Sequence, residues 1–378
     1  MLGVIVAGMD RAERRSDISV YFPNLNSGGV ERMHLSLAPP LSSEGFDTTI
    51  VVDRNDGSLA SSVPSTIPVF SLKAARSVGA IFPLAKYIRE QKPSIVVANM
   101  GHPNLIALFA NWLAGRRTRI IMCQHNHLTN QSAEETKWQH KVLPMLYRVF
   151  LRHADAIVCV SRGVADDLAK TTGVPRERIS VIYNPAVPVD AAARAAQPAD
   201  HPWFGGDKPV IVAVGRLVAA KDYPTMLSAL AKVPDARLLI LGEGHLRATL
   251  DEQVAQLGIG DRVDFVGFVK NPFAYMARAD LFLLSSRYEG FGNVVAEALS
   301  CGVPVVSTDC ESGPAEILED GVYGRLVPIA DPDAMAQAIS LTLAEPRDPE
   351  RLKARAAMFT VDVATREYAA LYRTVLTR

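Results

Sequence analysis

The chain has 378 residues, of which 48% are apolar and 21% are charged. That length exceeds one ordinary hydrophobic core, so we expect two globular domains. The 40 basic and 40 acidic side chains balance to a formal charge of zero, which argues against a nucleic-acid-binding protein. Residues 1–190 carry 21 Lys and Arg against 16 Asp and Glu, so the first half is basic and suits an anionic partner, although ordinary solvated surface has the same pattern.

The cysteines and the N-terminal segment indicate the cellular compartment of the protein. Cys123, Cys159, Cys301 and Cys310 have no spacing typical of a metal or redox site, so we expect small core residues in a reducing compartment. The first nine residues lack a secretory leader pattern, and no segment approaches the ~20 consecutive apolar residues of a membrane span. We therefore expect a cytoplasmic protein.

Short β-branched runs alternate with segments of helical period through residues 1–185. The runs are residues 18–22, 48–52, 95–98, 119–123 and 156–160. This alternation predicts a doubly wound α/β domain. Gly28 and Gly29 follow the first strand and precede a helix that starts near Val30, so their backbone can approach a ligand closely; a tight strand–helix turn is the alternative.

Residues 186–208, rich in Pro, Ala, Asp and Gly, break the alternation and are interpreted as a linker. The pattern restarts over residues 209–360, with strands expected at 210–214, 237–241, 263–266, 281–284, 304–307 and 324–327. A final helix over 361–378 is expected to cross back to the first domain. The fold class predicted is therefore α/β, with two Rossmann-like domains facing a cleft.

The most informative segment is the loop from Glu289 to Glu297. It follows the apolar strand 281–284, continues through Gly290, Phe291 and Gly292, and enters a helix for which Asn293 is the predicted N-cap. A strand, a glycine-rich loop and a helix in this order place backbone N–H groups where a phosphate binds. Glu297, one turn into the helix, can accept hydrogen bonds from a ligand diol.

Two cations follow the first strand of the second domain. Arg216 comes directly after Gly215, and Lys221 lies five residues further on. Both side chains can reach the oxygens of a diphosphate, the guanidinium as a fork and the ammonium as a compact charge. The alternative is a pair of ordinary surface cations, but their position after a buried strand favours a functional role.

Together these motifs resemble the retaining GT-B glycosyltransferases of family 4, over nearly the whole chain. The segments that carry the resemblance are 289–297, Gly28-Gly29, Gly215-Arg216 with Lys221, Gly242-Glu243-Gly244 and Phe265-Val266-Gly267. Asn293 and residues 308–318 are similar to enzymes that transfer hexose or N-acetylhexosamine from UDP-sugars in bacterial glycan assembly. The resemblance implies a nucleotide-sugar donor, with a GDP-mannose-dependent mannosyltransferase as the alternative.

The resemblance also implies roles for individual residues. Glu297 would bind the ribose hydroxyls, and Glu289 would lie against the donor sugar and the pyrophosphate. His125 matches the histidine that contacts the donor sugar near the reacting carbon in related enzymes, and His127 is a competitor two residues away. The donor-binding residues implied are Gly28, Gly29, Arg216, Lys221, Gly244, Val266, Glu289, Gly290, Phe291, Gly292, Asn293 and Glu297.

The reaction expected is same-face substitution without a metal or other cofactor. No second carboxylate is placed as a nucleophile, so the departing phosphate oxygen would take the acceptor's proton. Two cations and a helix N-terminus can replace a metal ion. The only Asp-x-Asp, Asp331-Pro332-Asp333, precedes a helical pattern, where Asp333 is expected to be an N-cap.

The acceptor side is less defined. Trp138, Tyr147 and Phe150 interleave with basic residues between positions 136 and 153, which suits an anionic lipid surface or a polyprenyl-linked acceptor at the inner face of the plasma membrane. The alternative is an amphipathic helix packed on the sheet. Two rivals of another class are a nucleotide-sugar 2-epimerase and an inactive nucleotide-sugar-binding protein.

Overall fold

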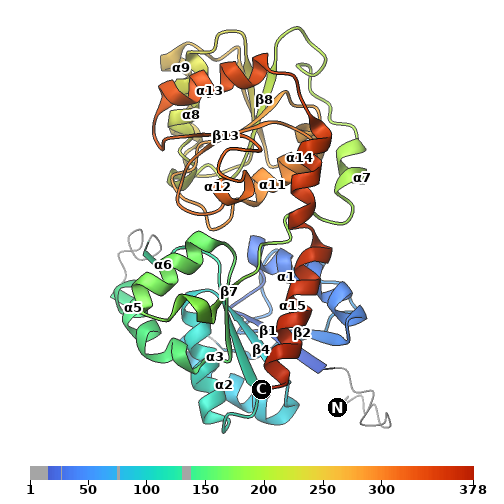
Figure 1. Ribbon diagram of the computed structural model, residues 1–378, viewed down its shortest axis with the longest axis vertical. Helices are drawn as coiled ribbons and strands as arrows, with labels where there is room; N and C mark the ends of the chain where they lie inside the picture. The colour runs from blue at the N-terminus through green and yellow to red at the C-terminus, as the bar shows by residue number, and fades with distance from the viewer. Residues whose placement is uncertain (1–15, 27, 75–76, 130–137) are drawn as a thin grey trace. The chain divides into compact units, whose positions relative to one another are not determined.

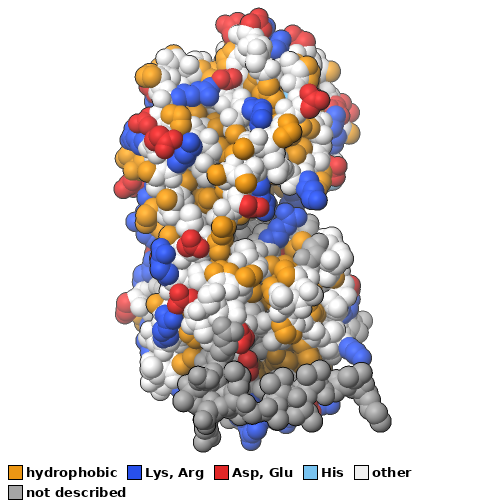
Figure 2. All heavy atoms as spheres, turned by 90° about the vertical axis from the view of Figure 1, so that its right-hand side faces the viewer, with side chains coloured by type: hydrophobic (Ala, Val, Ile, Leu, Met, Phe, Trp, Pro, Cys, Tyr) orange, Lys and Arg blue, Asp and Glu red, His pale blue; other side chains and the backbone are white. Residues whose placement is uncertain are grey.

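The computed structural model describes residues 16–26, 28–74, 77–129 and 138–378. Among these residues the chain forms two compact units (Figure 1). Unit 1 is drawn from residues 1–124, 141–158 and 365–378, and unit 2 from residues 125–140 and 159–364. On the face drawn in Figure 2 basic and acidic side chains are intermixed, as a formal charge of zero suggests.

The first sheet has seven strands in the order β3-β2-β1-β4-β5-β6-β7. The strands are β1 (Ser16–Phe22), β2 (Phe46–Val52), β3 (Val69–Ser71), β4 (Ile95–Asn99), β5 (Arg119–Gln124), β6 (Ala156–Cys159) and β7 (Ile179–Val181). Strand β1 pairs in parallel with both β2 and β4, so the strand order reverses on either side of it. The helices that connect the strands are α1 (Gly29–Ser43), α2 (Ile81–Gln91), α3 (Gly101–Leu113), α5 (Trp138–Phe150) and α6 (Arg162–Thr172).

The second sheet has six strands in the order β10-β9-β8-β11-β12-β13. They are β8 (Val210–Val214), β9 (Arg237–Leu241), β10 (Val263–Gly267), β11 (Leu281–Leu284), β12 (Val305–Thr308) and β13 (Arg325–Val327). All the pairings are parallel, and the order reverses between β8 and β11. In such a sheet, ligands bind beyond the carboxyl ends of the strands at the reversal point. The doubly wound α/β class predicted from the sequence is confirmed.

The remaining helices surround the second sheet and close the chain. They are α7 (Ala191–Ala196), α8 (Tyr223–Ala231), α9 (Arg247–Leu257), α10 (Pro272–Met276), α11 (Asn293–Ser300), α12 (Pro314–Ile317), α13 (Pro332–Ala344), α14 (Pro349–Ala356) and α15 (Val361–Leu376). Helix α7 lies within the segment 186–208. The last helix contributes residues from Thr365 onward to unit 1, where Arg373 Nη2 lies 2.6 Å from Glu44 Oε2 and Tyr372 packs edge-on against Phe46.

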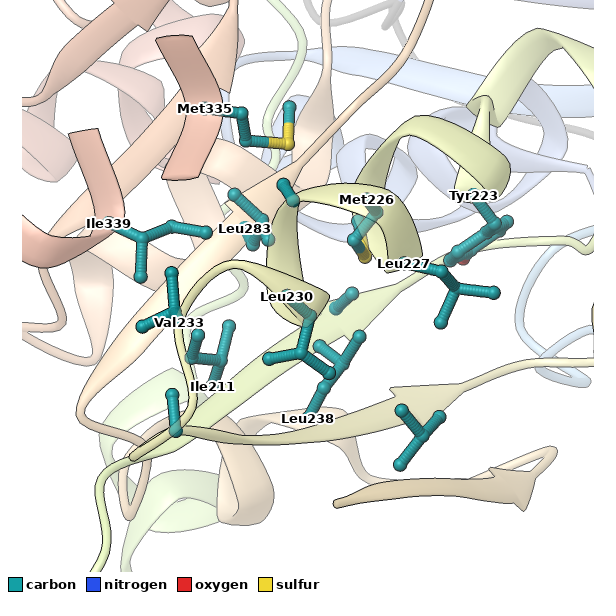
Figure 3. Packing of buried hydrophobic residues seen from close by; sticks show 14 of the residues in the cluster. Ile211, Tyr223, Met226, Leu227, Leu230, Val233, Leu238, Leu283, Met335 and Ile339 are labelled. Carbon is teal, nitrogen blue, oxygen red and sulfur yellow. The ribbon is translucent and has the colours of Figure 1, made fainter. Parts of the chain in front are cut away.

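The core of unit 2 lies where the helices pack on the second sheet. Leu227 and Leu230 of α8, together with Ile339 of α13, pack on fully buried strand residues such as Ile211 and Leu283 (Figure 3). Burying each such side chain contributes roughly 1.5–3 kcal/mol. The strands are largely apolar because helices cover both faces of a parallel sheet. Their carboxyl ends, where the polar loops begin, are therefore held in fixed positions.

Candidate active site

The loop after β11 meets the loop after β8 through one ion pair. Lys221 Nζ lies 2.5 Å from Glu289 Oε1, with side chains that are 21% and 13% exposed. The same carboxylate oxygen accepts a hydrogen bond from Ser286 Oγ at 2.7 Å. The two loops leave the adjacent strands β8 and β11, so the pair stands at the reversal point of the sheet. The sequence predicted one pocket for these two residues, and the structure brings them into contact.

The loop after β8 is fixed by hydrogen bonds to its own surroundings. Ser285 Oγ donates to the Lys221 carbonyl at 2.7 Å, and the Tyr223 hydroxyl donates to the Gly215 carbonyl at 3.0 Å. Arg216 is exposed and makes no ion pair with a carboxylate among the described residues. An exposed guanidinium and an anchored ammonium on one loop after β8 suit a doubly charged anion such as a diphosphate.

The loop after β9 packs backbone to backbone against the loop after β8. A Cβ built at Gly242 would collide with the Gly215 carbonyl, and one built at Gly244 would collide with the Leu217 carbonyl. Leu217 N–H donates to the Glu243 carbonyl at 2.9 Å, and Gly242 N–H donates to the Gly267 carbonyl, one residue after Val266, at 2.8 Å. Glycine is thus required at Gly242 and Gly244 by close approach. Gly244 lies on the loop after β9, and Val266 lies near the end of the neighbouring strand β10.

The start of α11 differs from the prediction. The N-cap is Gly292, with φ of +87°, and Asn293 is the first helical residue, so the prediction of Asn293 as the N-cap is wrong. Gly292 adopts a left-handed conformation, which glycine reaches without steric cost. This turn therefore does not need an asparagine side chain to stabilise it. Asn293 instead accepts a hydrogen bond from Asn184 Nδ2 at 3.0 Å. Glu297 lies one turn further along, half-buried, on the same helix.

The middle of the glycine-rich loop contacts segments of unit 2 that are distant from it in the sequence. A Cβ at Gly290 would collide with the carbonyl oxygen of His125, and Ser161 Oγ donates to the Gly290 carbonyl at 2.8 Å. Phe291 is buried, and its carbonyl lies where a Cβ of Gly313 would be. His125, 5% exposed, therefore adjoins the loop through its backbone. The contacts of this histidine with the loop backbone explain why position 290 needs glycine.

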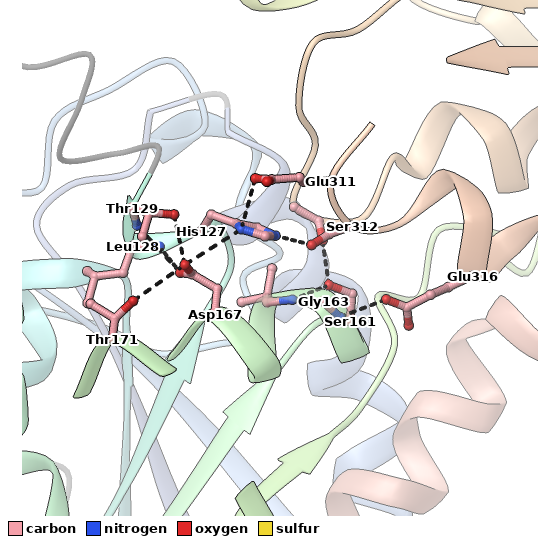
Figure 4. A network of polar contacts seen from close by, with 12 residues as sticks. His127, Leu128, Thr129, Ser161, Gly163, Asp167, Thr171, Glu311, Ser312 and Glu316 are labelled. Atoms are coloured by element: carbon pink, nitrogen blue, oxygen red, sulfur yellow. Dashed lines mark hydrogen bonds and ion pairs between the residues drawn. The ribbon is translucent and has the colours of Figure 1, made fainter. Parts of the chain in front are cut away.

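His127 is part of an extended polar network (Figure 4). His127 Nε2 contacts Ser312 Oγ, while Nδ1 lies 3.6 Å from Glu311 Oε2 and 3.9 Å from Asp167 Oδ1. Asp167 accepts hydrogen bonds from the backbone N–H of Leu128 at 2.6 Å and from Thr129 Oγ1 at 2.8 Å. The network ties the segment after β5 to the segment after β12. Its members Asp167, Glu311 and Ser312 were not predicted as site residues, because they are far apart in the sequence.

A second link joins the start of α6 to α12. The Glu316 carboxylate of α12 accepts hydrogen bonds from Arg162 N–H at 2.8 Å and Gly163 N–H at 2.9 Å, at the N-terminus of α6. A carboxylate at a helix N-terminus is stabilised by the helix dipole and satisfies N–H groups that lack partners within the helix. The anion-binding end of α6 is therefore occupied by a side chain of the chain itself.

Gly28 and Gly29 belong to unit 1, where Gly28 is the N-cap of α1. A Cβ at Gly28 would collide with the Glu31 carboxylate, which sits in the first turn of the helix and is 6% exposed. Burial raises the pKa of Glu31, and a hydrogen bond from its own backbone N–H opposes that shift. Glu31 is a buried acidic residue next to Gly28 that the sequence analysis did not single out. The signal that could have indicated it is an acidic residue three positions after Gly28.

Both aspartates of the Asp331-Pro332-Asp333 motif have structural roles. Asp331, not Asp333, is the N-cap of α13: its side chain accepts hydrogen bonds from Asp333 N–H and Ala334 N–H. The expectation for Asp333 was therefore wrong by two residues, and Asp333 forms an ion pair with Lys232. Among the residues that the structure describes, no group of three or more His, Cys, Asp or Glu side chains is arranged to hold a metal ion.

The cysteine near the site is unreactive in character. Burial, followed by the negative charge of Glu289, raises the pKa of the Cys310 thiol to about 12. Burial likewise raises the pKa values of Cys123 and Cys301 to about 12. These three thiols stay protonated at neutral pH. Cys123 and Cys310 are buried, as expected for core residues, whereas Cys301 is only partly buried. The chemistry of the site therefore rests on its cations, carboxylates and backbone amides.

Comparison with known proteins identifies the class. A model of the glycosyl transferases group 1 family matches residues 198–358, and a model of glycosyltransferase family 4 matches residues 27–188. Anabaena HepE, solved in complex with UDP and glucose, superposes with a TM-score of 0.70 at 21% identity, over 95% of this chain and 97% of that one. The two Rossmann-like sheets and this likeness define a GT-B glycosyltransferase fold.

Two relatives of known activity extend the match. The N-acetylgalactosamine-N,N'-diacetylbacillosaminyl-diphospho-undecaprenol 4-alpha-N-acetylgalactosaminyltransferase of Campylobacter jejuni is 30% identical over 339 residues, 86% of this chain and 90% of that protein. A GDP-mannose-dependent alpha-(1-6)-phosphatidylinositol monomannoside mannosyltransferase of Mycolicibacterium smegmatis is 33% identical over 254 residues, 62% of this chain and 63% of that protein. The chain belongs to the group 1 glycosyltransferases of family 4.

Proposed function

We propose that this glycosyltransferase moves a hexose or N-acetylhexosamine from a UDP-sugar to a glycan or lipid-linked acceptor in bacterial glycan assembly, with retention of configuration. The observation that carries the proposal is the Lys221–Glu289 pair at the reversal point of the second sheet, with Arg216 exposed on the same loop as Lys221. That arrangement suits a diphosphate joined to a sugar. The Campylobacter relative, whose name gives a diphospho-undecaprenol acceptor and an α linkage, supports the acceptor class.

In the proposed reaction, the bond from the sugar's anomeric carbon to the diphosphate oxygen breaks as the acceptor oxygen bonds to the same face. The departing phosphate oxygen takes the acceptor's proton. Arg216 and Lys221 stabilise the negative charge that grows on the diphosphate, and Glu297 accepts hydrogen bonds from the ribose hydroxyls. Glu289, held by Lys221 and Ser286, orients the donor sugar and is not a nucleophile. His125 is proposed to face the donor sugar.

We propose that transfer needs no metal ion, because two side-chain cations and the N-terminus of α11 can balance the diphosphate charge. A chelator supplies the test. Transfer in excess EDTA at the rate seen without it supports the proposal; loss of activity that Mn²⁺ or Mg²⁺ restores overturns it.

The division of the chain is also a proposal. It comprises an acceptor-side domain (1–185), a linker (186–208), a donor domain (209–360) and a returning helix (361–378).

The alternatives are separated by one incubation with a radiolabelled UDP-sugar and a polyprenyl-linked glycan. Label in the lipid fraction supports transfer, an epimerised donor supports a 2-epimerase, and unchanged donor supports an inactive nucleotide-sugar-binding protein. A thermal-shift series with UDP, GDP and ADP tests the base: the proposal expects the largest stabilisation with UDP. Stabilisation by GDP alone would favour the mannosyltransferase alternative, for which the Mycolicibacterium relative is the supporting observation.

A further inference from the structure

Asp222, at the end of the loop after β8, has a backbone conformation that few side chains adopt. Its φ of +45° and ψ of +47° lie in the left-handed region. This conformation is disfavoured for a residue with a Cβ, whereas glycine adopts it without steric cost. Asp222 directly follows Lys221 and directly precedes α8. A residue held in such a conformation needs contacts that stabilise it.

The stabilising contacts are made by the Asp222 carboxylate, which is buried. The residue is 3% exposed. Its Oδ2 accepts a hydrogen bond from Thr225 Oγ1 of α8 at 3.0 Å and lies 3.2 Å from Arg287 Nε of the loop after β11. Burying a carboxylate is costly unless the group is paired and hydrogen-bonded. The carboxylate therefore connects the two loops, which a glycine in the same turn could not do.

Arg287 holds the loop after β8 from the opposite side. Its backbone N–H donates to the Ala220 carbonyl at 2.8 Å, while its guanidinium contacts Asp222. Two residues earlier, Ser285 Oγ donates to the Lys221 carbonyl at 2.7 Å. The peptide groups on both sides of Lys221 are thus attached to the loop after β11.

This attachment determines where the Lys221 ammonium lies. A lysine side chain is flexible, so the position of its charge depends on the place and direction in which the backbone presents it. The ammonium contacts Glu289, which belongs to the same loop as Arg287. A displacement of about 1 Å in a site of this kind can cost on the order of 10² in rate. The contacts of Asp222 and Arg287 therefore bear on how well Lys221 meets an anion.

We propose that Asp222 and Arg287 are positioning residues for Lys221. Their side chains lock the loop after β8 to the loop after β11, and the locked loops place the Lys221 ammonium against the diphosphate of the donor. Neither residue is assigned a contact with the reacting atoms. The inference rests on the proposed function, in which Lys221 stabilises the departing diphosphate. One of its tests uses no substrate, so the two can fail separately.

Asp222→Gly is the most informative variant, because it removes the carboxylate and relieves the left-handed backbone together. The Asp222 side chain makes no cap hydrogen bond to α8, so the start of the helix does not depend on it. We expect kcat with the UDP-sugar to fall about tenfold. In a Lys221→Met background the same substitution should change kcat less than twofold, because the group to be positioned is absent. A merely structural role would lower kcat equally in both backgrounds.

The chain offers matched controls for both positioning residues. Asp320 is also left-handed, with φ of +51°, but it is exposed, so Asp320→Gly should keep the parent kcat. Arg287→Met should lower kcat several-fold, and Arg287→Lys, which keeps a cation, should recover most of that loss. Arg347 forms an ion pair with Asp280 at the amino end of β11, away from the site, so Arg347→Met should keep the parent kcat.

Amide hydrogen exchange tests the attachment without a substrate. The amides of residues 217, 218, 221 and 222 are hydrogen-bonded, so a peptide covering residues 216–222 reports on this loop. Its exchange should be at least fivefold faster in Asp222→Gly than in the parent or in Asp320→Gly. Equal exchange in the parent and Asp222→Gly would overturn the inference, as would equal losses of kcat with and without Lys221. If the parent transfers no sugar, the proposed function fails, and the exchange result alone decides the inference.

Discussion

Lys221 Nζ and Glu289 Oε1 lie 2.5 Å apart although 68 residues separate them in the sequence. The contact exists because β8 and β11 are neighbours in the sheet, so the loops at their carboxyl ends meet. Both side chains are largely buried, and Ser286 adds a second donor to the same carboxylate oxygen. An oriented carboxylate and an ammonium group are thus held at the reversal point before any donor binds.

Replacing Lys221 with Met should lower kcat by roughly 10²–10³, because one preorganised donor to the developing diphosphate charge is lost. Steady-state kinetics with the UDP-sugar measure this. Lys232→Met is the matched control, since Lys232 pairs with the exposed Asp333 away from the site. A Lys221 variant with kcat within about twofold of the parent would contradict the assigned role.

Replacing Glu297 with Gln should weaken UDP binding by about tenfold, roughly 1.4 kcal/mol, because the amide is a weaker acceptor for the ribose hydroxyls than the carboxylate. Calorimetric titration with UDP provides the measurement. Glu252→Gln, an exposed acid on α9, should bind UDP as the parent does. If both variants bind UDP equally tightly, Glu297 does not contact the nucleotide.

His127→Gln and Ser312→Ala should each lower kcat by about tenfold, and the double variant should lose little more than either one. The physical reason is that the two side chains form one contact, which holds a left-handed residue at Ser312, with φ of +67°, beside the glycine-rich loop. A double-variant cycle on kcat gives the coupling. Strictly additive losses would show that His127 and Ser312 act separately.

His34 makes unit 1 less stable in acid. Burial lowers the pKa of His34 to about 4, and a hydrogen bond with Asn99 Oδ1 at 2.8 Å opposes that shift. The unfolded chain binds this proton near pH 6.5, so stability is full above that pH and is lost as the pH falls towards 4. The loss should be of the order of 3 kcal/mol, at about 1.4 kcal/mol per pH unit.

Urea unfolding at pH 7.5 and pH 4.5 tests this dependence. In His34→Gln the part of the pH effect due to His34 should disappear, leaving a variant that is destabilised at pH 7.5 but less sensitive to acid. Burial raises the pKa of Asp53 to about 6, so this carboxyl has the opposite effect between about pH 4 and 6 and is common to both proteins. An identical pH dependence in parent and variant would contradict the role of His34.

The buried strands were predicted well because their chemistry is local. Residues 210–214, 238–241 and 281–284 are apolar on both faces, and the structure has strands at the predicted bounds 210–214, 237–241 and 281–284. The strands β3 and β7 were missed because each has three residues and an exposed position, so neither forms an apolar run. Pairing in the sheet, rather than side-chain pattern, makes these segments strands.

The parts of the site that depend on long-range contacts were not predictable from spacing. Nothing local indicates that Ser161 binds the Gly290 carbonyl, or that the Glu316 carboxylate caps α6, because those contacts span more than a hundred residues. The caps of α11 and α13 were misassigned for a local reason. Neighbouring polar residues compete for the cap position, and backbone geometry at Gly292 and Asp331 decides it.

The most direct test of the proposed function is time-resolved proton NMR of the purified protein with a UDP-N-acetylhexosamine and a polyprenyl-diphosphate glycan in excess EDTA. The account predicts that the first product signal is an α-anomeric proton, formed from the α-linked donor while UDP appears in equal amount. A β-anomeric first product, or no transfer until a divalent metal is added, would contradict it.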